Sequence, residues 1–260
     1  MTTQEPSFAF FLGGRDLEMH SIAALLAARR SAGDERVGPV HDHGLAWGAL
    51  ASAYAGDIAA AAADGLRPVL VELTADIALP EGTIAIDHHG SRSAEPAALR
   101  QVFDLLDLPA NLWTRDMALV AANDTGHVAA LTRMGATMAE AAAIRARDRA
   151  AQGITAGQEA QGAAALRAMR PALGGSLIVV DLPHDRTATV VDPLALAGDH
   201  RDLLILAPES AQFFGSGARI ARLDAAFPGG WRGGELPLRG FWGLPQRLPV
   251  VALLRTIAGH

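Results

Sequence analysis

Apolar runs alternate with helical stretches through the first half of the chain, and this alternation constrains the fold more than any other feature. The runs are Phe8–Leu12, Pro68–Leu73 and Thr83–Ile86, with an extended segment at Val37–His43 and alanine-rich stretches between them. Strands that are apolar almost throughout, separated by helices, are typical of a parallel sheet covered on both faces. We therefore predict an α/β fold for this half.

The pattern changes near residue 140. Residues 139–170 are rich in Ala, Arg and Gln with few turn signals, which indicates one or two exposed helices. Beyond Gly174 short strands return, with a Gly/Pro-rich run from Phe227 to Gly243. We predict an α/β domain at 1–140, a helical connector at 141–172 and a smaller C-terminal α/β domain at 173–260.

Composition removes several kinds of chemistry. The chain has no cysteine, and all 22 basic residues are arginine, so thiolate metal sites, thiol nucleophiles and lysine Schiff bases are excluded. Its formal charge of -6, without a basic run, makes duplex nucleic acid an unsuitable partner. No signal peptide or membrane span is indicated, and we expect a cytoplasmic protein.

Three polar residues follow one of the predicted strands. Asp87, His88 and His89 come directly after Thr83–Ile86, at the edge where open parallel sheets bind ligands. Such a triplet can bind a metal through one imidazole, face substrate with the other, and orient or bridge with the carboxylate. Asp, His and Gly are also ordinary turn residues, so a surface turn is the alternative.

Further carboxylates and an imidazole occur near other strand ends. Asp124 lies among small residues after an apolar helical stretch, and Glu72 interrupts an apolar strand, where a buried carboxylate needs a cationic partner. Glu18 and His20 follow the Gly13-Gly14 turn and precede a helix predicted to begin near Ser21. We expect all of these side chains at one sheet edge.

In this order the motifs resemble those of the DHH phosphoesterase superfamily, over roughly residues 8–126. The triplet Asp87-His88-His89 matches the motif that names the superfamily, and Asp124 matches its fourth motif. The first motif agrees only in length, since Gly14 stands in place of a metal-binding His, and Glu18 and His20 in place of two Asp residues. Glu72 takes the position of the second motif's Asp, with Asp76 as a nearby rival.

The resemblance implies a site for divalent metal, with up to two ions per chain. One ion would be bound by His20, Glu72, His88 and Asp124, and a second partly by Glu18 and Glu72. His89 would contact phosphate, so His89 and Asp87 are the predicted catalytic residues. His20 in place of an Asp removes an anionic ligand, which favours manganese, cobalt, iron or zinc, and of these Mn²⁺ is the predicted ion.

Gly14 leaves one ligand of the superfamily pattern unfilled. His41 and His43 alternate along an extended segment and could supply an imidazole, although His-Asp-His-Gly is also a plausible turn. Asp16 is another substitute or a solvated turn residue, and His127 could share a helical face with Asp124 or lie at the surface.

The C-terminal domain combines flexible backbone with arginine, as anion-binding surfaces do. The predicted substrate-binding residues are Arg219, Arg222, Gly230, Arg232, Gly233 and Gly234. Phe241 and Trp242 could stack on a ring or pack within the domain.

These features predict metal-dependent hydrolysis of a phosphate ester or phosphoanhydride in a small phosphorylated or nucleotide-like substrate, by metal-activated water. The alternative is a catalytically degenerate protein of the DHH fold that binds a nucleotide, a metal or a partner. The small phosphorylated substrate is the predicted partner, and a homodimer stays open.

Overall fold

The computed structural model describes residues 7–259, and the chain divides into two compact units, Met1–Gly153 and Ile154–His260. The residues predicted as a separate connector fall into both units. Helix α5 (Met138–Ala151) belongs to the first, whereas α6 (Ala156–Arg167) and β5 (Arg170–Ala172) belong to the second. No helix among the described residues is long and apolar enough to cross a membrane.

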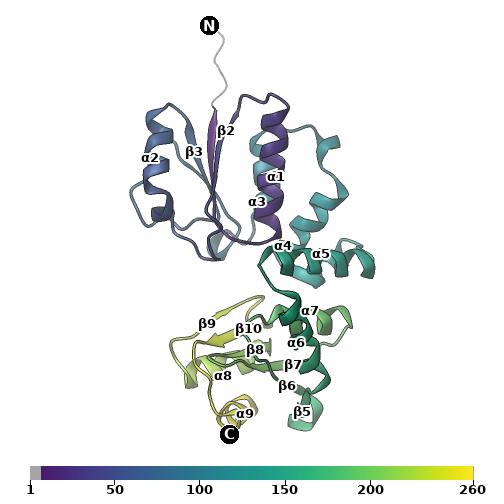
Figure 1. The fold of residues 1–260 in the computed structure, drawn as a ribbon. Coiled ribbons are helices and arrows are strands. Elements are labelled where there is room, and N and C mark those ends of the chain that lie inside the picture. Colours follow the sequence, from purple (N-terminus) through teal and green to yellow (C-terminus); the bar gives the residue numbers. More distant parts are fainter. Residues whose placement is uncertain (1–6, 260) are drawn as a thin grey trace. The chain divides into compact units, whose positions relative to one another are not determined.

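The first unit is built on a four-stranded parallel sheet, which confirms the predicted α/β class. Its strands are β1 (Phe8–Leu12), β2 (Val37–Asp42), β3 (Arg67–Val71) and β4 (Ile84–Ile86), in the order β2-β1-β3-β4. Helix α2 (Ala55–Ala63) lies on one side, and α1 (Leu17–Ser31) and α3 (Ala98–Leu105) lie on the other (Figure 1). β1 is buried along its whole length, which explains its uninterrupted apolar sequence.

Short 3-10 turns and two long helices complete the unit. The turns are η1 (Ala51–Tyr54), η2 (Gly90–Arg92) and η3 (Ala110–Leu112). Helix α4 (Arg115–Arg133) is bent at Gly126 and His127, where the backbone leaves the helical region. Helix α5 begins with a capping box between Thr137 and Glu140 and packs beside α4.

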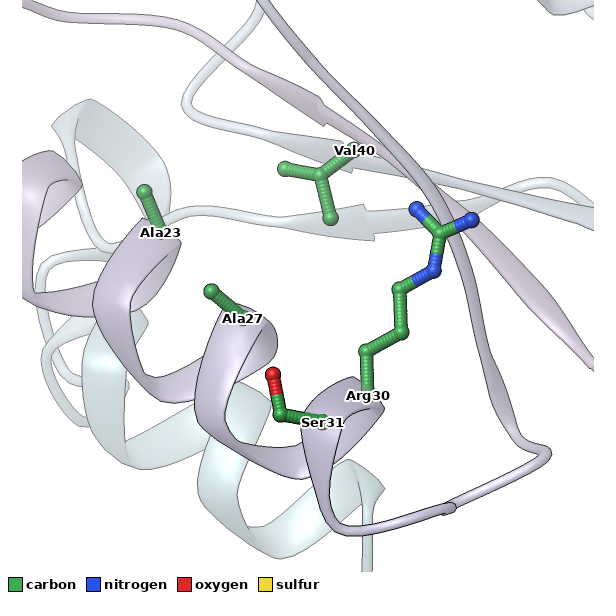
Figure 2. A pocket seen from close by; sticks show the side chains of 5 residues that line it. All are labelled: Ala23, Ala27, Arg30, Ser31 and Val40. Atoms are coloured by element: carbon green, nitrogen blue, oxygen red, sulfur yellow. The ribbon is translucent and has the colours of Figure 1, made fainter.

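Small residues leave a shallow pocket between α1 and the edge strand β2 (Figure 2). It is lined by Ala23, Ala27, Arg30, Ser31 and Val40. None of these five side chains is a carboxylate or an imidazole, so the pocket has no ligands for a metal.

The second unit is a mixed six-stranded sheet in the order β5-β6-β7-β8-β10-β9. Its strands are β6 (Leu177–Asp181), β7 (Asp202–Leu206), β8 (Ala211–Ser216), β9 (Trp231–Gly233) and β10 (Arg239–Leu244), besides β5. β6 and β7 are parallel, and the other pairs are antiparallel. The turn η4 (Leu173–Gly175) lies between β5 and β6. The prediction of a second, smaller α/β domain is confirmed.

Two hydrophobic clusters cover the two faces of this sheet. One contains residues of α8 (Gly217–Ala226) and α9 (Val250–Ala258), packed on Phe213 and Trp242. The other contains residues of α6 and α7 (Ala188–Leu196), packed on β6 and β7. Trp242 is fully buried, so the packing alternative is correct for this side chain, while Phe241 is half-buried.

Candidate metal centre

Four side chains from separate segments of the first unit converge on one point. His88 Nε2 lies 2.5 Å from Asp124 Oδ2, 3.2 Å from Glu72 Oε1 and 3.9 Å from Glu18 Oε2. His88 follows β4, Glu72 follows β3, Glu18 lies in the first turn of α1 and Asp124 lies in α4. The chain therefore brings together four of the side chains that the sequence predicted as metal ligands.

Glu72 reaches this point by an unusual backbone conformation. The sequence predicted it inside a strand, but β3 ends at Val71, and Glu72 has a left-handed φ of 52°. Its amide donates to the Ile86 carbonyl (2.8 Å), which links the ends of β3 and β4. A non-glycine residue held at positive φ stores local strain, and such residues concentrate at functional sites.

Gly13 makes room for this turn. A Cβ at Gly13 would lie 2.3 Å from the Glu72 carbonyl oxygen, far inside van der Waals contact. The loop after β1 can therefore pass this close to Glu72 only with glycine at position 13.

Helix α1 begins earlier than predicted, and this separates Glu18 from His20. Asp16 is the N-cap and accepts a hydrogen bond from the Met19 amide (2.8 Å), so the helix starts at Leu17. Each residue turns the helix by about 100°, so the side chains of Glu18 and His20, two residues apart, point in directions about 200° apart around the helix axis. Glu18 is accordingly buried, whereas His20 is exposed and is not one of the converging side chains.

The two oxygens of Glu18 have different surroundings. Oε1 accepts the Leu99 amide at the start of α3 (2.9 Å). Oε2 is buried without a hydrogen-bond partner and faces His88. One oxygen thus fixes the side chain and leaves the other available to a cation.

The Asp87-His88-His89 triplet is an organised loop. Asp87 Oδ1 accepts both the His89 amide and the His89 ring Nδ1–H, each at 2.9 Å. The Gln101 side chain donates to the Asp87 carbonyl (3.0 Å). His88 is buried while the ring of His89 is 40% exposed, so the two imidazoles face different environments.

The charges at this site are poorly balanced in the protein alone. Burial by itself would lower the pKa of His88, but contacts with Asp124 and Glu72 outweigh it and raise that pKa to about 10. Burial, with the nearby charges of Asp124 and Glu72, raises the pKa of Glu18 well above its ordinary value. Burial likewise raises the pKa of Asp16 to about 7, with the charges of Asp124 and Glu72 adding to it. The carboxylates need more positive charge than His88 can provide.

The donor atoms fit a divalent cation. Glu18 Oε2, Glu72 Oε1, His88 Nε2 and Asp124 Oδ2 are all buried and lack a hydrogen bond of normal geometry. Ligand atoms of Glu72, His88, His89 and Asp124 all lie within 4.8 Å of one another. Buried polar atoms nearly always make hydrogen bonds. Several buried ligand atoms without a normal hydrogen bond at one point therefore indicate a cation site.

Other predicted ligands lie elsewhere. His41 and His43 approach Asp57 (3.7 and 3.9 Å) and stack on Phe11 and Tyr54, outside the converging group. Asp57 itself lies within the first turn of α2.

Two further alternatives are settled by local geometry. Asp76, the rival of Glu72, is exposed and accepts the Ser52 amide (2.8 Å). His127 does not continue the helical face of Asp124, because its φ of 47° lies at the bend of α4.

A Cβ at Gly14 would lie 3.2 Å from Asp16 Oδ2, so Asp16 is the acidic group next to that position.

A small pocket of about 220 Å³ borders the cluster. Its lining includes Gly14, Trp47, Glu72, Asp87 and His89. The ring of Trp47 is 76% exposed and meets the His89 ring edge-on, with centroids 6.2 Å apart. Trp47 was not among the predicted site residues; a tryptophan in a short segment between Gly44 and Gly48 was the available signal.

A buried polar network supports the site from α5. Arg145 donates to Asn123 Oδ1 and Asp148 Oδ2, both at 2.8 Å. Asp148 Oδ1 accepts the Leu17 amide (3.2 Å). These residues were also missed, because α5 had been predicted as part of an exposed connector.

The predicted substrate-binding arginines of the second unit make contacts within that unit. Arg219 pairs with Asp202 (2.8 Å), Arg222 donates to the Ile257 carbonyl (2.6 Å) and Arg232 pairs with Asp224 (2.9 Å). The glycines have packing reasons: a Cβ at Gly230, Gly233 or Gly234 would lie 2.2–2.7 Å from a backbone or ring atom of β10. A role in substrate binding stays a prediction for all six.

No family model matches the chain, and no curated protein matches its sequence. Several solved structures, however, match the structure of this chain. RecJ exonuclease bound to manganese is 13% identical, with a TM-score of 0.47, over 98% of this chain and 89% of that one. RecJ with Mn²⁺ from Thermus thermophilus is 14% identical (TM-score 0.48) over 98% of this chain and 51% of that one.

An exopolyphosphatase-related protein from Bacteroides fragilis is 11% identical (TM-score 0.49), over 97% of this chain and 91% of that one. The structural neighbours of this chain thus include an exonuclease and an exopolyphosphatase-related protein. At these identities the likeness concerns the fold, and the roles of residues in this chain rest on its own geometry.

Proposed function

We propose that this protein is a metal-dependent phosphoesterase that hydrolyses a phosphate ester or phosphoanhydride of a small phosphorylated molecule. The observation that carries the proposal is the convergence of four buried ligand atoms from Glu18, Glu72, His88 and Asp124, none of which makes a hydrogen bond of normal geometry. Mixed carboxylate and imidazole ligation suits Mn²⁺. This preference does not depend on His20, which was predicted as a ligand but lies outside the cluster.

A divalent ion bound there would offset the charge of phosphate oxygens and make water a stronger nucleophile. The oxygen of water forms a bond to phosphorus and gives up a proton, the bond to the leaving oxygen breaks, and the leaving oxygen takes up a proton, so that one water is consumed.

His89 is placed to contact the phosphoryl group. It lines the pocket beside the cluster, and Asp87 holds its Nδ1–H (2.9 Å), which directs Nε2 away from Asp87. In the imidazolium form Nε2–H can donate to a phosphoryl oxygen or to the leaving oxygen. The hydrogen bond to the carboxylate of Asp87 fixes the ring orientation.

The experiment measures metal content and phosphate release together. The metal-free protein is titrated with Mn²⁺ by calorimetry, and phosphate release is assayed on nucleotides, aryl phosphate and pyrophosphate. We expect Asp124→Asn and His88→Ala to weaken Mn²⁺ binding at least about tenfold and to reduce turnover roughly 100-fold.

His20→Ala is the matched control, because His20 is an exposed imidazole on the same helix as Glu18. It should retain both properties. Turnover that survives Asp124→Asn would refute the assignment. Metal binding without turnover on any substrate of the panel would instead support the non-enzymatic alternative.

A further inference from the structure

The second unit contains a pocket of about 430 Å³ that shares no residue with the metal centre. It lies where the loop after β6 meets the turn between β7 and β8. The residues that define its chemistry are His184, Glu209, Ser210, Gln212, Trp231 and Pro245. Carboxyl ends of parallel strands, here β6 and β7, are common places for ligands in α/β sheets.

One wall of the pocket is a tryptophan ring fixed on the sheet. Trp231 in β9 pairs with Gly243 in β10, and a Cβ at Gly243 would lie 2.3 Å from two atoms of the Trp231 ring. The indole therefore packs directly against the backbone at Gly243. Its side chain is 43% exposed, so part of the ring remains accessible to a ligand.

This part of the sheet is less covered than the rest. Residues of α6 and α7 pack on β6 and β7. Along β8, however, burial alternates, and Gln212 and Phe214 are only half-buried. Of these two side chains, Gln212 lines the pocket, whereas Phe214 packs against the cluster beneath α6 and α7.

His184 forms a second wall of the pocket. Its Nδ1 accepts the Arg186 amide (3.1 Å), and its Nε2 lies 3.0 Å from the Gln158 carbonyl oxygen. With both nitrogens engaged within the protein, the ring offers a ligand its flat surface.

The remaining polar groups favour a ligand that donates hydrogen bonds. Glu209 is exposed and makes no ion pair within residues 7–259, whereas the second lining carboxylate, Asp185, lies 3.6 Å from Arg186. No arginine is among the lining residues, so a phosphate group would meet the negative charge of Glu209. The Ser210 hydroxyl and the Gln212 amide supply neutral hydrogen-bonding groups.

We propose that this pocket binds an amino-bearing planar heterocycle of the nucleobase class. Its ring stacks on Trp231, and its amino and ring N–H groups donate to the Glu209 carboxylate. Guanine presents two adjacent donors to a carboxylate, whereas thymine presents one N–H between two carbonyl oxygens. Guanosine should therefore bind more tightly than thymidine.

The test uses nucleosides, which lack phosphate, and the full chain without added metal. Calorimetric titrations with guanosine, cytidine, adenosine and thymidine should give the tightest binding for guanosine. Trp231→Ala and Glu209→Gln should each weaken guanosine binding about tenfold, in line with the usual contribution of base stacking and of a charged hydrogen bond. Trp231→Phe, which keeps a ring, should lose less.

Leu238→Ala is the control, because Leu238 is an exposed apolar side chain of the same unit, outside the pocket. It should bind guanosine like the unmodified protein. Unchanged affinity in folded Trp231→Ala, equal affinities for guanosine and thymidine, or no binding of any nucleoside would overturn the proposal. Asp124→Asn should retain guanosine binding, so this result is independent of the metal centre.

Discussion

The buried guanidinium of Arg145 donates a hydrogen bond to the side-chain oxygen of Asn123 at 2.8 Å, one residue before Asp124. Arg145 also pairs with Asp148, which holds the amide of Leu17, one residue before Glu18. A single arginine in α5 thus contacts the side chain next to Asp124 directly and, through Asp148, the backbone next to Glu18. We infer that it positions them.

Arg145→Ala should lower the free energy of unfolding by about 3–5 kcal/mol, because it leaves a buried carboxylate and amide without their partner. It should also weaken Mn²⁺ binding, since Asp124 and Glu18 lose support. Urea unfolding and calorimetric titration measure the two effects, and Arg145→Lys should recover part of both.

Arg147→Ala is the comparison for Arg145→Ala. Arg147 lies on the exposed side of α5, the helix that also contains Arg145, and it pairs with Asp116 of α4. Exposed ion pairs contribute less than about 1 kcal/mol to stability. If both variants lost the same stability and metal affinity, the positioning role of Arg145 would be wrong.

Gly13→Ala should destabilise the protein by about 2 kcal/mol or more and weaken Mn²⁺ binding. The added methyl group would lie 2.3 Å from the Glu72 carbonyl oxygen, so the loop or the left-handed turn at Glu72 must move. Gly56→Ala is the matched change: its Cβ would meet no atom within 4 Å, and its place in α2 should make it stabilising by up to about 1 kcal/mol. Equal metal affinity in the two variants would show that Glu72 needs no such clearance.

Much of the fold could be predicted because burial on both faces leaves a direct record in the sequence. β1 and β3 read as apolar runs for that reason, and the helices between them require parallel strands. The position of the Asp87-His88-His89 triplet could also be predicted, since it follows directly after β4 in the sequence. The division of residues 141–172 between two units was not, because it depends on packing of α5 against α4.

The site was harder to predict where one hydrogen bond decides the local structure. The Asp16 cap moves the start of α1 to Leu17, and that shift turns Glu18 inward and His20 outward. Glu72 has the expected neighbours, but its left-handed backbone conformation requires that position 13 carry no side chain. The hydrophobic periodicity of the sequence contains no information about such a contact between two loops. Asp16 itself changed from a minor alternative to a half-buried neighbour of the cluster, whose pKa the charges of Asp124 and Glu72 help to raise.

Trp47→Ala should affect substrates according to their leaving group. The exposed indole borders the pocket that holds His89, and its loop is fixed by backbone bonds of Thr74 to Ala49 and Ala51 (3.0 and 2.9 Å). We expect KM for a nucleotide to rise about tenfold, because a base can stack on this ring, while kcat/KM for pyrophosphate stays within about twofold. Equal losses for both substrates would indicate a general structural role for Trp47.

Asp34 provides the pH prediction, far from the metal centre. It joins the end of α1 to β2 through both Arg29 (3.2 Å) and a two-bonded contact with Arg36 (2.9 Å each). The hydrogen bonds from Arg36 lower the pKa of Asp34 from 3.8 to about 2. A carboxyl with a lowered pKa stabilises the fold above its unfolded pKa, and this contribution disappears as pH falls through the folded value.

Asp34→Asn should therefore lower the free energy of unfolding by about 1–2 kcal/mol at pH 7, a figure reduced for the partial exposure of both arginines. The gap to the unmodified protein should narrow between about pH 4 and pH 2, where Asp34 becomes protonated in both states. Urea unfolding at pH 7, 4 and 3 measures the gap. Asp64→Asn, which alters an exposed carboxylate after α2, should change stability little at any of these values. A gap for Asp34→Asn that stays constant from pH 7 to pH 3 would mean that its ion pairs do not stabilise the fold.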